Sequence, residues 1–234
     1  MMQTTTLSLG EQLLLLALDD EKGTVASLAS MPLGYGLAGA AILYLTLMDR
    51  LAMDGKSLVA VNAASTNDDI LDEALAEITS AVRARDPRYW VGKLATDIKH
   101  HRERLAERLV QRGILHHEEH RILGIIPSQR YPTDNPQPAG DVRNHIRAVV
   151  LDGATADTRT VLLISLAKAC SLLDSLFSRE ERKGARQRVE QMTREEAVGK
   201  AVTETVASVT AAVIAATTAA TVGASTATMS ASSS

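Results

Sequence analysis

The chain has 234 residues, a formal net charge of −3 and 45% hydrophobic residues, enough for one domain or two small ones with a buried core. A slightly acidic chain has no global basic field to hold nucleic acid or an anionic membrane, so any anion binding must be local. Aromatic residues make up 3% of the chain, and a core of Leu, Ala, Val and Ile favours helices over a β-sandwich.

The chain begins with a polar segment that lacks the pattern of a signal peptide. A short apolar helix is predicted over Leu9–Leu18, with Ser8 and Glu11 spaced as a capping box. Thr24–Gly34 is rich in small residues and contains a proline, so we expect an exposed loop there. The next helix, Tyr35–Met48, has no polar face and must be surrounded by protein.

Gly36 and Gly39 lie three residues apart on this apolar helix and predict a close approach by neighbouring helices. Met48–Val61 then has the pattern of two strands around an Asp54-Gly55 turn, a strong hairpin signature. Two further helices are predicted, one capped by the Asn67-Asp68-Asp69 run and one that starts at Asp86-Pro87.

The stretch Asp97–Ile126 organises the middle of the chain. Its pattern predicts one amphipathic helix that Gly113 ends, followed by two short apolar strands around a polar turn over His116–His120. This repeats the helix-plus-hairpin order of the earlier segment. The apolar arc of the helix is predicted to hold Leu94, Ile98, Leu105, Ala106, Leu109 and Val110.

Two cations, Lys99 and Arg102, fall inside that apolar arc and in the first turns of the predicted helix. A cation on the core side is costly unless an anion or polar group meets it. Helix N-termini also favour anions, so the pair predicts a local phosphate site. Two other interpretations stay open. The charged heads can return to water, or internal carboxylates such as Glu103 and Asp72 can pair with them.

The rest of the chain is predicted to be helical after a proline-studded loop from Pro127 to Pro138. We expect two shells, in which central apolar helices are wrapped by amphipathic ones and decorated with two small β-hairpins. This makes the fold mainly α. Cys170 lies in the most apolar of these helices and is predicted to be a buried free thiol. The predicted helices are Asp141–Leu151, Arg159–Phe177, the charged and solvated Arg179–Met192, and Glu195 to about Val222.

The C-terminal stretch Thr205–Ser234 carries no charge, but it consists largely of Ala and Thr, which add little insertion free energy. We therefore expect a core helix rather than a membrane span. The predicted division is one helical domain over residues 1–222 and a disordered Ser/Ala/Thr tail over residues 223–234.

Several catalytic or binding motifs are present only formally. His116–His120 matches the zinc-peptidase string H-x-x-E-H, but that chemistry needs a helix where a solvated turn is expected. Gly34, Gly36 and Gly39 have dinucleotide-fingerprint spacing, yet they follow a loop instead of a strand. The two helix-plus-hairpin units suggest a winged helix, but neither helix offers a polar basic face for DNA. We therefore predict no enzyme, no metal, no cofactor and no nucleic acid.

With these residues in view, the chain resembles the Golgi phosphoprotein 3 family in its short bacterial form. The strings that carry the resemblance span about Leu7–Met192 and are LSLGEQLLLLALDDEKG, GLAGAAILYLTLMDRLAMDG, DDILDEALAEI, Trp90-Val91, HHRERLAERLVQRGIL and the YP-containing loop. The resemblance implies an almost all-helical, non-enzymatic peripheral membrane protein. It also implies recognition of phosphatidylinositol 4-phosphate and, in eukaryotes, sorting of Golgi glycosyltransferases.

The resemblance carries the lipid pocket over only in part. Lys99 and Arg102 occupy the places of the two arginines that meet the headgroup phosphate in eukaryotic relatives. A third arginine of the relatives is replaced by Ala38, and a pocket tryptophan falls at Ala29. Lys99 cannot reproduce the bidentate fork of an arginine. Binding is therefore expected to be markedly weaker than in relatives with the full set.

The second family element is an apolar hairpin tip, which relatives insert into the bilayer or use for self-association. Ile125 and Ile126, beside Ile122 and Leu123, are the candidates for membrane contact, and ordinary strand burial is the alternative.

The resulting hypothesis is a cytoplasmic, peripherally membrane-associated protein that binds anionic phospholipid headgroups, with protein cargo and a homo-oligomer as further expected partners. The rival hypothesis is a soluble adaptor or scaffold that has kept the fold and lost the lipid.

Overall fold

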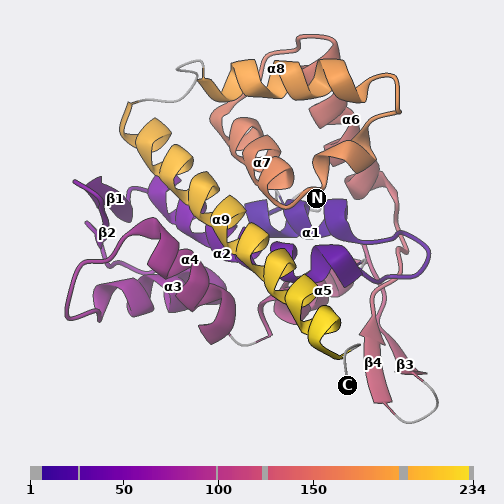
Figure 1. Cartoon of the computed structure of the whole chain (residues 1–234), viewed down its shortest axis with the longest axis horizontal. Helices are drawn as coiled ribbons and strands as arrows, with labels where there is room; N and C mark the ends of the chain where they lie inside the picture. Colours follow the sequence, from indigo (N-terminus) through magenta and orange to yellow (C-terminus); the bar gives the residue numbers. More distant parts are fainter. Residues whose placement is uncertain (1–6, 26, 99, 123–125, 195–199, 232–234) are drawn as a thin grey trace, which may run out of the picture.

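A computed structural model describes residues 7–25, 27–98, 100–122, 126–194 and 200–231. The described chain is mainly helical, with two small antiparallel hairpins, so the predicted fold class is confirmed (Figure 1). In chain order the elements are α1 (Leu9–Ala17), α2 (Ser27–Leu47), β1 (Leu51–Asp54), β2 (Ser57–Ala60), α3 (Asp69–Thr79), α4 (Pro87–Asp97), α5 (His101–Gln111), β3 (Glu118–Ile122), β4 (Ile126–Arg130), α6 (Gln137–Leu151), α7 (Thr158–Ala169), the 3-10 helix η1 (Leu173–Leu176), α8 (Arg182–Arg194) and α9 (Lys200–Ala231).

Helix α2 is the centre of the fold, and it contacts α1, α4, α7 and α9 (Figure 1). Its apolar residues pack on all sides, as the lack of a polar face predicts. A Cβ added at Gly39 would lie 2.9 Å from Cγ2 of Val213 on α9, and one at Gly36 would overlap the Cys170 thiol. The close helix approach predicted at these two glycines is therefore confirmed.

The predicted helix caps are also confirmed. Ser8 and Glu11 form the capping box of α1, in which the Glu11 amide lies 3.1 Å from Ser8 Oγ. Asp68 accepts from two amides of the first turn of α3, and Asp86 accepts from the Tyr89 amide at 2.8 Å. These caps can be predicted from the sequence because each one depends only on residues within a single turn of its own helix.

The loop predicted over Thr24–Gly34 is wrong. Helix α2 already begins at Ser27 and continues through Pro32. A proline inside a helix loses one backbone hydrogen bond, but here the surrounding helices bury Leu33 and Leu37 to 1% exposure. This burial stabilises the helical conformation that the local sequence disfavours.

The first hairpin forms as predicted, with Asp54 paired to Ser57 across a two-residue turn in which Gly55 has φ of +57°. Leu51 and Leu58 point into the core, with 2% and 1% of their surface exposed. The Leu58 amide also donates to the Arg85 carbonyl at 2.8 Å, which ties β2 to the loop before α4. This hairpin is part of the body of the protein.

The single helix predicted up to Gly113 is wrong at its start. Helix α4 ends at Asp97, and α5 begins only at His101, after His100 in a left-handed conformation with φ of +52°. The apolar arc is therefore shared between two helices, because Leu94 belongs to α4. The part of the arc that lies in α5 is confirmed, since Leu105, Ala106 and Leu109 are buried.

The second hairpin forms, but its register differs from the prediction. Glu118–His120, predicted as part of a polar turn, belongs to β3, and the expected proline-rich loop begins as strand β4. Residues 118–120 are exposed, since the hairpin projects from the body beside α5 (Figure 1, lower right). A projecting hairpin needs no apolar alternation, so hydrophobic pattern alone placed its turn wrongly.

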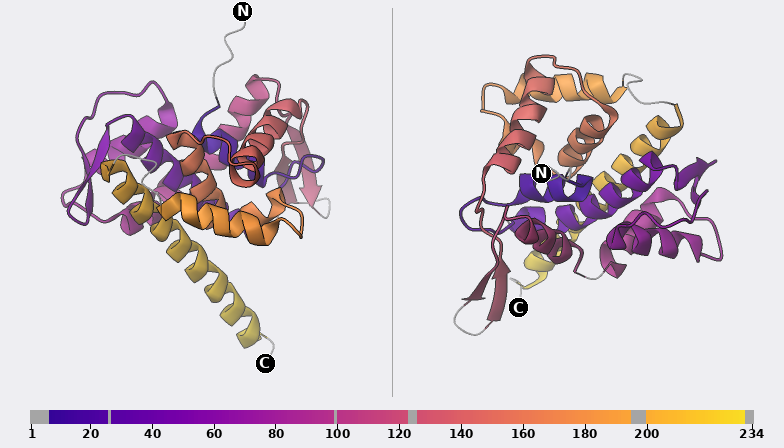
Figure 2. Two further views of the ribbon diagram at one scale, coloured as in Figure 1. Left: turned by 90° about the horizontal axis from the view of Figure 1, so that it is seen from above. Right: turned by 180° about the vertical axis from the view of Figure 1, so that it is seen from behind.

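The C-terminal half closes the fold. Helix α6 starts at Gln137, before the predicted Asp141, and α7 ends at Ala169, short of the predicted Phe177. The core-helix prediction for α9 is confirmed, because Val209, Ala212 and Val213 are buried. Helix α9 continues past the predicted boundary at Val222 to Ala231 and extends away from the body (Figure 2, left). Within the described residues, no helix combines the length and hydropathy needed to cross a bilayer.

Candidate functional site

The first turn of α5 differs from the starts of four other helices. Side chains of Ser8, Asp68, Asp86 and Asp157 cap α1, α3, α4 and α7, whereas His100 provides no side-chain cap for α5. The start of α5 therefore presents the positive end of a helix dipole without a side-chain cap, as the start of α6 also does, although Glu103 lies in the first turn of α5. Such a helix start attracts anions.

Arg102 lies in this first turn with 40% of its side chain exposed, and its Nη2 atom is 2.7 Å from Oε1 of Glu103. Of the partners that the sequence left open, Glu103 is the one found. Asp72 instead accepts hydrogen bonds from Ser65 and Thr66. Lys99, the other predicted cation, lies outside the described residues. Arg102 therefore pairs with an acid of its own turn while part of its side chain also reaches water.

The other two arginines of α5 form ion pairs with acids at the start of α3. Arg104 lies 2.5 Å from a Glu73 oxygen and 2.6 Å from an Asp69 oxygen, and Arg108 lies 2.8 Å from an Asp68 oxygen. The hydrogen bond from Arg104 is the largest cause that lowers the pKa of Asp69 to about 2. These ion pairs hold α5 against α3, so the capacity of α5 to bind a further anion is confined to its first turn.

Sequence reasoning missed this network. It selected only Lys99 and Arg102 among the cations of this stretch and used the Asn67-Asp68-Asp69 run only as a helix cap. The spacing of four residues between Arg104 and Arg108 on one helix face was the only local signal. The partners lie more than thirty residues away in the chain, and no local pattern shows which helix will meet them.

His101 lies on the inner side of the first turn, beside a small cavity of about 20 Å³ that Leu37, Tyr44 and Leu105 also line. Its Nδ1 atom is buried and has no hydrogen-bond partner among the described residues. Burial, and then the charges of Arg104 and Arg108, lower the pKa of His101 to about 4. The imidazole is therefore neutral near pH 7 and adds no charge to the site.

A hollow of about 510 Å³ lies between α5 and the second hairpin, and it is lined by His100, which precedes α5, and by Glu103 and Glu107 of α5. The opposite wall holds Gln129 of β4 and Tyr131 just after it. Burial and the nearby Glu107 raise the pKa of Tyr131 to about 12. The base of the hairpin and the start of α5 thus face one shared hollow.

The family model described as Golgi phosphoprotein 3 (GPP34) matches residues 9–209. This range covers all elements from α1 to α8 and the start of α9. The chain belongs to the Golgi phosphoprotein 3 family. Eukaryotic members of this family have lipid-binding or adaptor roles, and the family is one of binding proteins rather than enzymes.

The remaining residues predicted from the Golgi phosphoprotein 3 pattern fall into two groups. Ala38 is fully buried within α2, so this position adds neither charge nor exposed surface. Ala29 lies in α2 and Ile126 begins β4, but their side chains, like all of Ile125, lie outside the described residues. Their predicted roles stay predictions.

The zinc-peptidase interpretation of His116–His120 was rejected from the sequence, and the structure supports that rejection. Glu118–His120 forms a strand instead of a helix. His116 lies with Nδ1 2.7 Å from Asp134 and Nε2 3.0 Å from Glu118, so it joins the base of the hairpin to the loop before α6. In the parts of the chain that the structure describes, no cluster of three or more His, Cys, Asp or Glu residues has metal-binding geometry.

Proposed function

We propose that this member of the Golgi phosphoprotein 3 family is a non-enzymatic peripheral membrane protein that binds anionic phospholipid headgroups at the start of α5. A phosphatidylinositol 4-phosphate-like headgroup is the proposed ligand, and Lys99 and Arg102 are the proposed phosphate contacts. The observation that carries the proposal is the helix start without a side-chain cap beside the half-exposed Arg102. The proposed place of action is the cytoplasmic face of a membrane.

The physical case rests on charge and accessibility. A phosphate at this position would meet the positive end of the helix dipole and the Arg102 guanidinium together. It would compete with the Glu103 carboxylate, which now holds Arg102 at 2.7 Å. Charged hydrogen bonds contribute about 1.5–3 kcal/mol each. Without a third arginine at Ala38, affinity should be lower than in relatives that have it.

The second hairpin is the proposed second membrane contact, through Ile125 and Ile126 at its tip. Support comes from its base, because Gln129 and Tyr131 share a hollow with His100 and Glu103. The hairpin therefore starts next to the proposed phosphate site and projects from the body there (Figure 2, right). A contact at this tip would add apolar burial to the electrostatic attraction at α5.

Flotation on liposomes tests the proposal. Vesicles of phosphatidylcholine with phosphatidylinositol 4-phosphate or phosphatidylserine should float the protein, and plain phosphatidylcholine should not. The double substitution Lys99→Ala/Arg102→Ala should weaken binding about tenfold or more. Glu103→Gln should strengthen it, because Arg102 then loses its internal competitor.

The matched control is Arg179→Ala/Lys183→Ala, which removes the same charge from exposed positions just before and within α8. It should leave flotation unchanged. Equal flotation of wild type and the Lys99→Ala/Arg102→Ala variant would end the proposal.

An adaptor function without lipid is the second candidate. The observation that favours it is the internal pairing of Arg102 with Glu103, together with the uncharged and buried Ala38. It predicts no flotation on any of these vesicles and capture of protein partners that Lys99→Ala/Arg102→Ala does not reduce. A homo-oligomer is compatible with either function, and light scattering of the purified chain would detect it.

A further inference from the structure

The loop between α3 and α4 and the first turn of α4 carry three arginines that have no acidic partner among the described residues. Arg83, Arg85 and Arg88 are exposed, and in the described part of the chain no carboxylate lies within 4.0 Å of their guanidinium groups. This contrasts with seven other arginines of the described chain. Ion pairs to acids hold Arg102, Arg104, Arg108, Arg112, Arg143, Arg147 and Arg186.

The acids of this loop and of the adjoining helices α3 and α4 that are named next all have partners within the protein. Asp86 caps α4 through the Tyr89 amide at 2.8 Å. Glu77 of α3 lies 2.7 Å from Lys93 Nζ, and Asp97 also pairs with Lys93. These two carboxylates raise the pKa of Lys93, so its charge is retained and neutralised inside the protein. The three arginines are left as a local surplus of positive charge in a chain whose net charge is −3.

Behind the loop lies a hollow of about 420 Å³ between the end of α3 and the first turns of α4. Its walls combine charged, aromatic and hydroxyl groups. A volume of this size suits a small ligand or a few side chains of a peptide. The lining includes Glu77, Ser80, Arg83, Arg85, Tyr89 and Trp90.

A backbone hydrogen bond and a ring contact fix the position of the loop. The Arg85 carbonyl accepts from the Leu58 amide at 2.8 Å, and the Arg85 guanidinium carbon lies 5.0 Å from the centre of the Tyr89 ring. Stacking on the ring fixes the plane of the guanidinium while its edge stays open to an acid. Val82, at 99% exposure, adds an apolar contact beside the arginines.

We propose that the loop before α4, the first turn of α4 and the hollow behind them bind an acidic, partly apolar segment of a partner protein. Charge complementarity identifies the acidic component, and the exposed Val82 and Tyr89 identify the apolar one. A peptide fits better than a bilayer because the surface is a hollow of about 420 Å³ rather than a flat face, and the one acid in its wall, Glu77, is already paired with Lys93.

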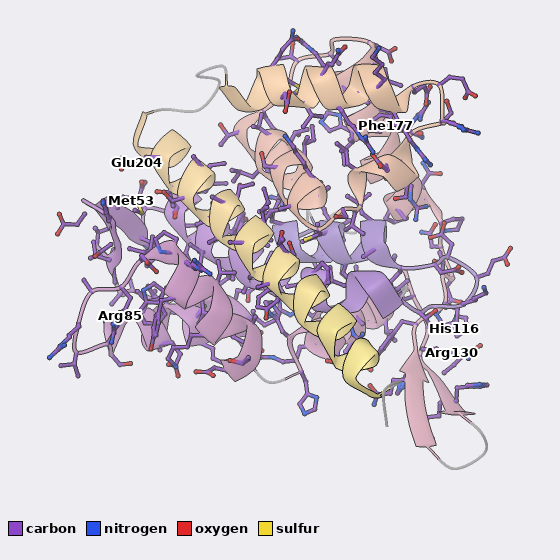
Figure 3. All side chains as sticks on the ribbon, in the orientation of Figure 1. Met53, Arg85, His116, Arg130, Phe177 and Glu204 are labelled. Atoms are coloured by element: carbon purple, nitrogen blue, oxygen red, sulfur yellow. The ribbon has the colours of Figure 1, made fainter. Side chains whose placement is uncertain are left out.

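This surface is separate from the proposed lipid site. Arg85 lies at the opposite end of the molecule from His116 and Arg130, which mark the second hairpin (Figure 3). A partner held at this surface would therefore leave the second hairpin free to contact a membrane. The inference does not depend on lipid binding, because no residue of α5 contributes to the hollow.

Trp90 provides a built-in probe, because it is the one tryptophan of the chain and lies in the wall of the hollow. The full chain is titrated with a peptide made of Glu and Leu, and tryptophan emission is followed. We expect a saturable change that weakens with added salt. Arg83→Ala/Arg85→Ala should raise the Kd about tenfold, with circular dichroism confirming that the exposed substitutions leave the fold intact.

Two matched variants serve as controls. Arg179→Ala/Lys183→Ala removes equal charge elsewhere, and Lys99→Ala/Arg102→Ala removes the proposed lipid contacts; neither should change the peptide Kd. An unchanged Kd for Arg83→Ala/Arg85→Ala, or equal binding of a Lys–Leu peptide, would overturn the proposal. It would also be overturned if no peptide bound while Arg83→Ala/Arg85→Ala abolished flotation on phosphatidylserine vesicles, which would identify a bilayer contact.

Discussion

The two hairpins follow the same plan, a helix followed by two short antiparallel strands, yet they are used in different ways. The β1–β2 hairpin after α2 buries Leu51 and Leu58 in the core and pairs with the Arg85 backbone. The β3–β4 hairpin after α5 exposes residues 118–120 and projects into solvent.

What differs is the way each hairpin is attached. The first is held by buried apolar side chains, and the second is held at its base by polar contacts. His117 stacks on the Tyr131 ring at 5.2 Å between centres, and His116 bridges Glu118 and Asp134. A hairpin fixed by core packing stabilises the fold, whereas one fixed only at its base leaves its outer part available for contact with other molecules.

The largest expected contrast is in stability. Leu58→Ala on β2 should lower the free energy of unfolding by about 2–5 kcal/mol, because it empties a fully buried site. The comparison substitution His120→Ala on β3 should change it by less than about 0.5 kcal/mol. Urea denaturation of both variants measures the difference. Equal losses would show that β3 is packed as tightly as β2 and would remove the distinction.

Acid should affect the α5 end through His101, whereas the β1–β2 region contains no histidine, because the first histidine of the chain is His100. The pKa of His101 is about 4 in the fold, against an ordinary value of 6.5. As the pH falls, the unfolded chain therefore takes up a proton first, and stability is lost between pH 6.5 and about 4. The loss should total about 3 kcal/mol.

Urea denaturation at several pH values across that window measures this loss. His101→Leu should flatten the pH dependence, whereas the exposed His120→Gln should not. A profile that stays equally steep in His101→Leu would show that the carboxylates, and not this imidazole, set the acid sensitivity.

The smallest effect is expected at the hairpin base. Glu118, then Asp134, raise the pKa of His116. Protonated His116 therefore stabilises the β3–β4 attachment below the ordinary pKa of 6.5, and this contribution disappears as the pH rises through the raised value. Hydrogen exchange, corrected for its intrinsic pH dependence, should show β3–β4 amides less protected at pH 8 than at pH 6.

In the same experiment β1–β2, which contains no histidine, should show no such difference. His116→Gln should abolish the change in β3–β4. Parallel changes in both hairpins would mean that the pH acts on the whole fold and not on this one attachment.

Features that were predicted correctly depend on neighbours in the chain or on composition. The capping box at Ser8 and Glu11, the caps Asp68 and Asp86, and the Asp54-Gly55 turn each need only a few adjacent residues. The buried position of α2 followed from its lack of any polar face. The family assignment followed from the order and spacing of strings along most of the chain, and the family model confirms it.

Features that were missed depend on residues far apart in the chain. Helix α2 extends back to Ser27 and continues through Pro32, and the burial of Leu33 and Leu37 by residues far along the chain outweighs the cost of the proline. The break at His100 separates α4 from α5, so a single helical wheel through both mixed two faces. The strand over Glu118–His120 has no apolar period, since the hairpin is not packed on the core.

The candidate sites show the same division. The sequence selected Arg102 and named Glu103 as one of its alternative partners, and both lie in one turn. It did not select Arg83 and Arg85 as a site, because their significance is the absence of acids that only folding brings near or keeps away.

By itself, therefore, the sequence determined the mainly helical fold, the helix caps, the first hairpin and the family. Tertiary structure decided where α5 begins, which arginines are neutralised by α3 and which hairpin projects. The physical reason is the distance along the chain between the residues that interact. Caps, turns and apolar faces are set within a few residues, whereas burial and ion pairing are set by whichever distant segment packs alongside.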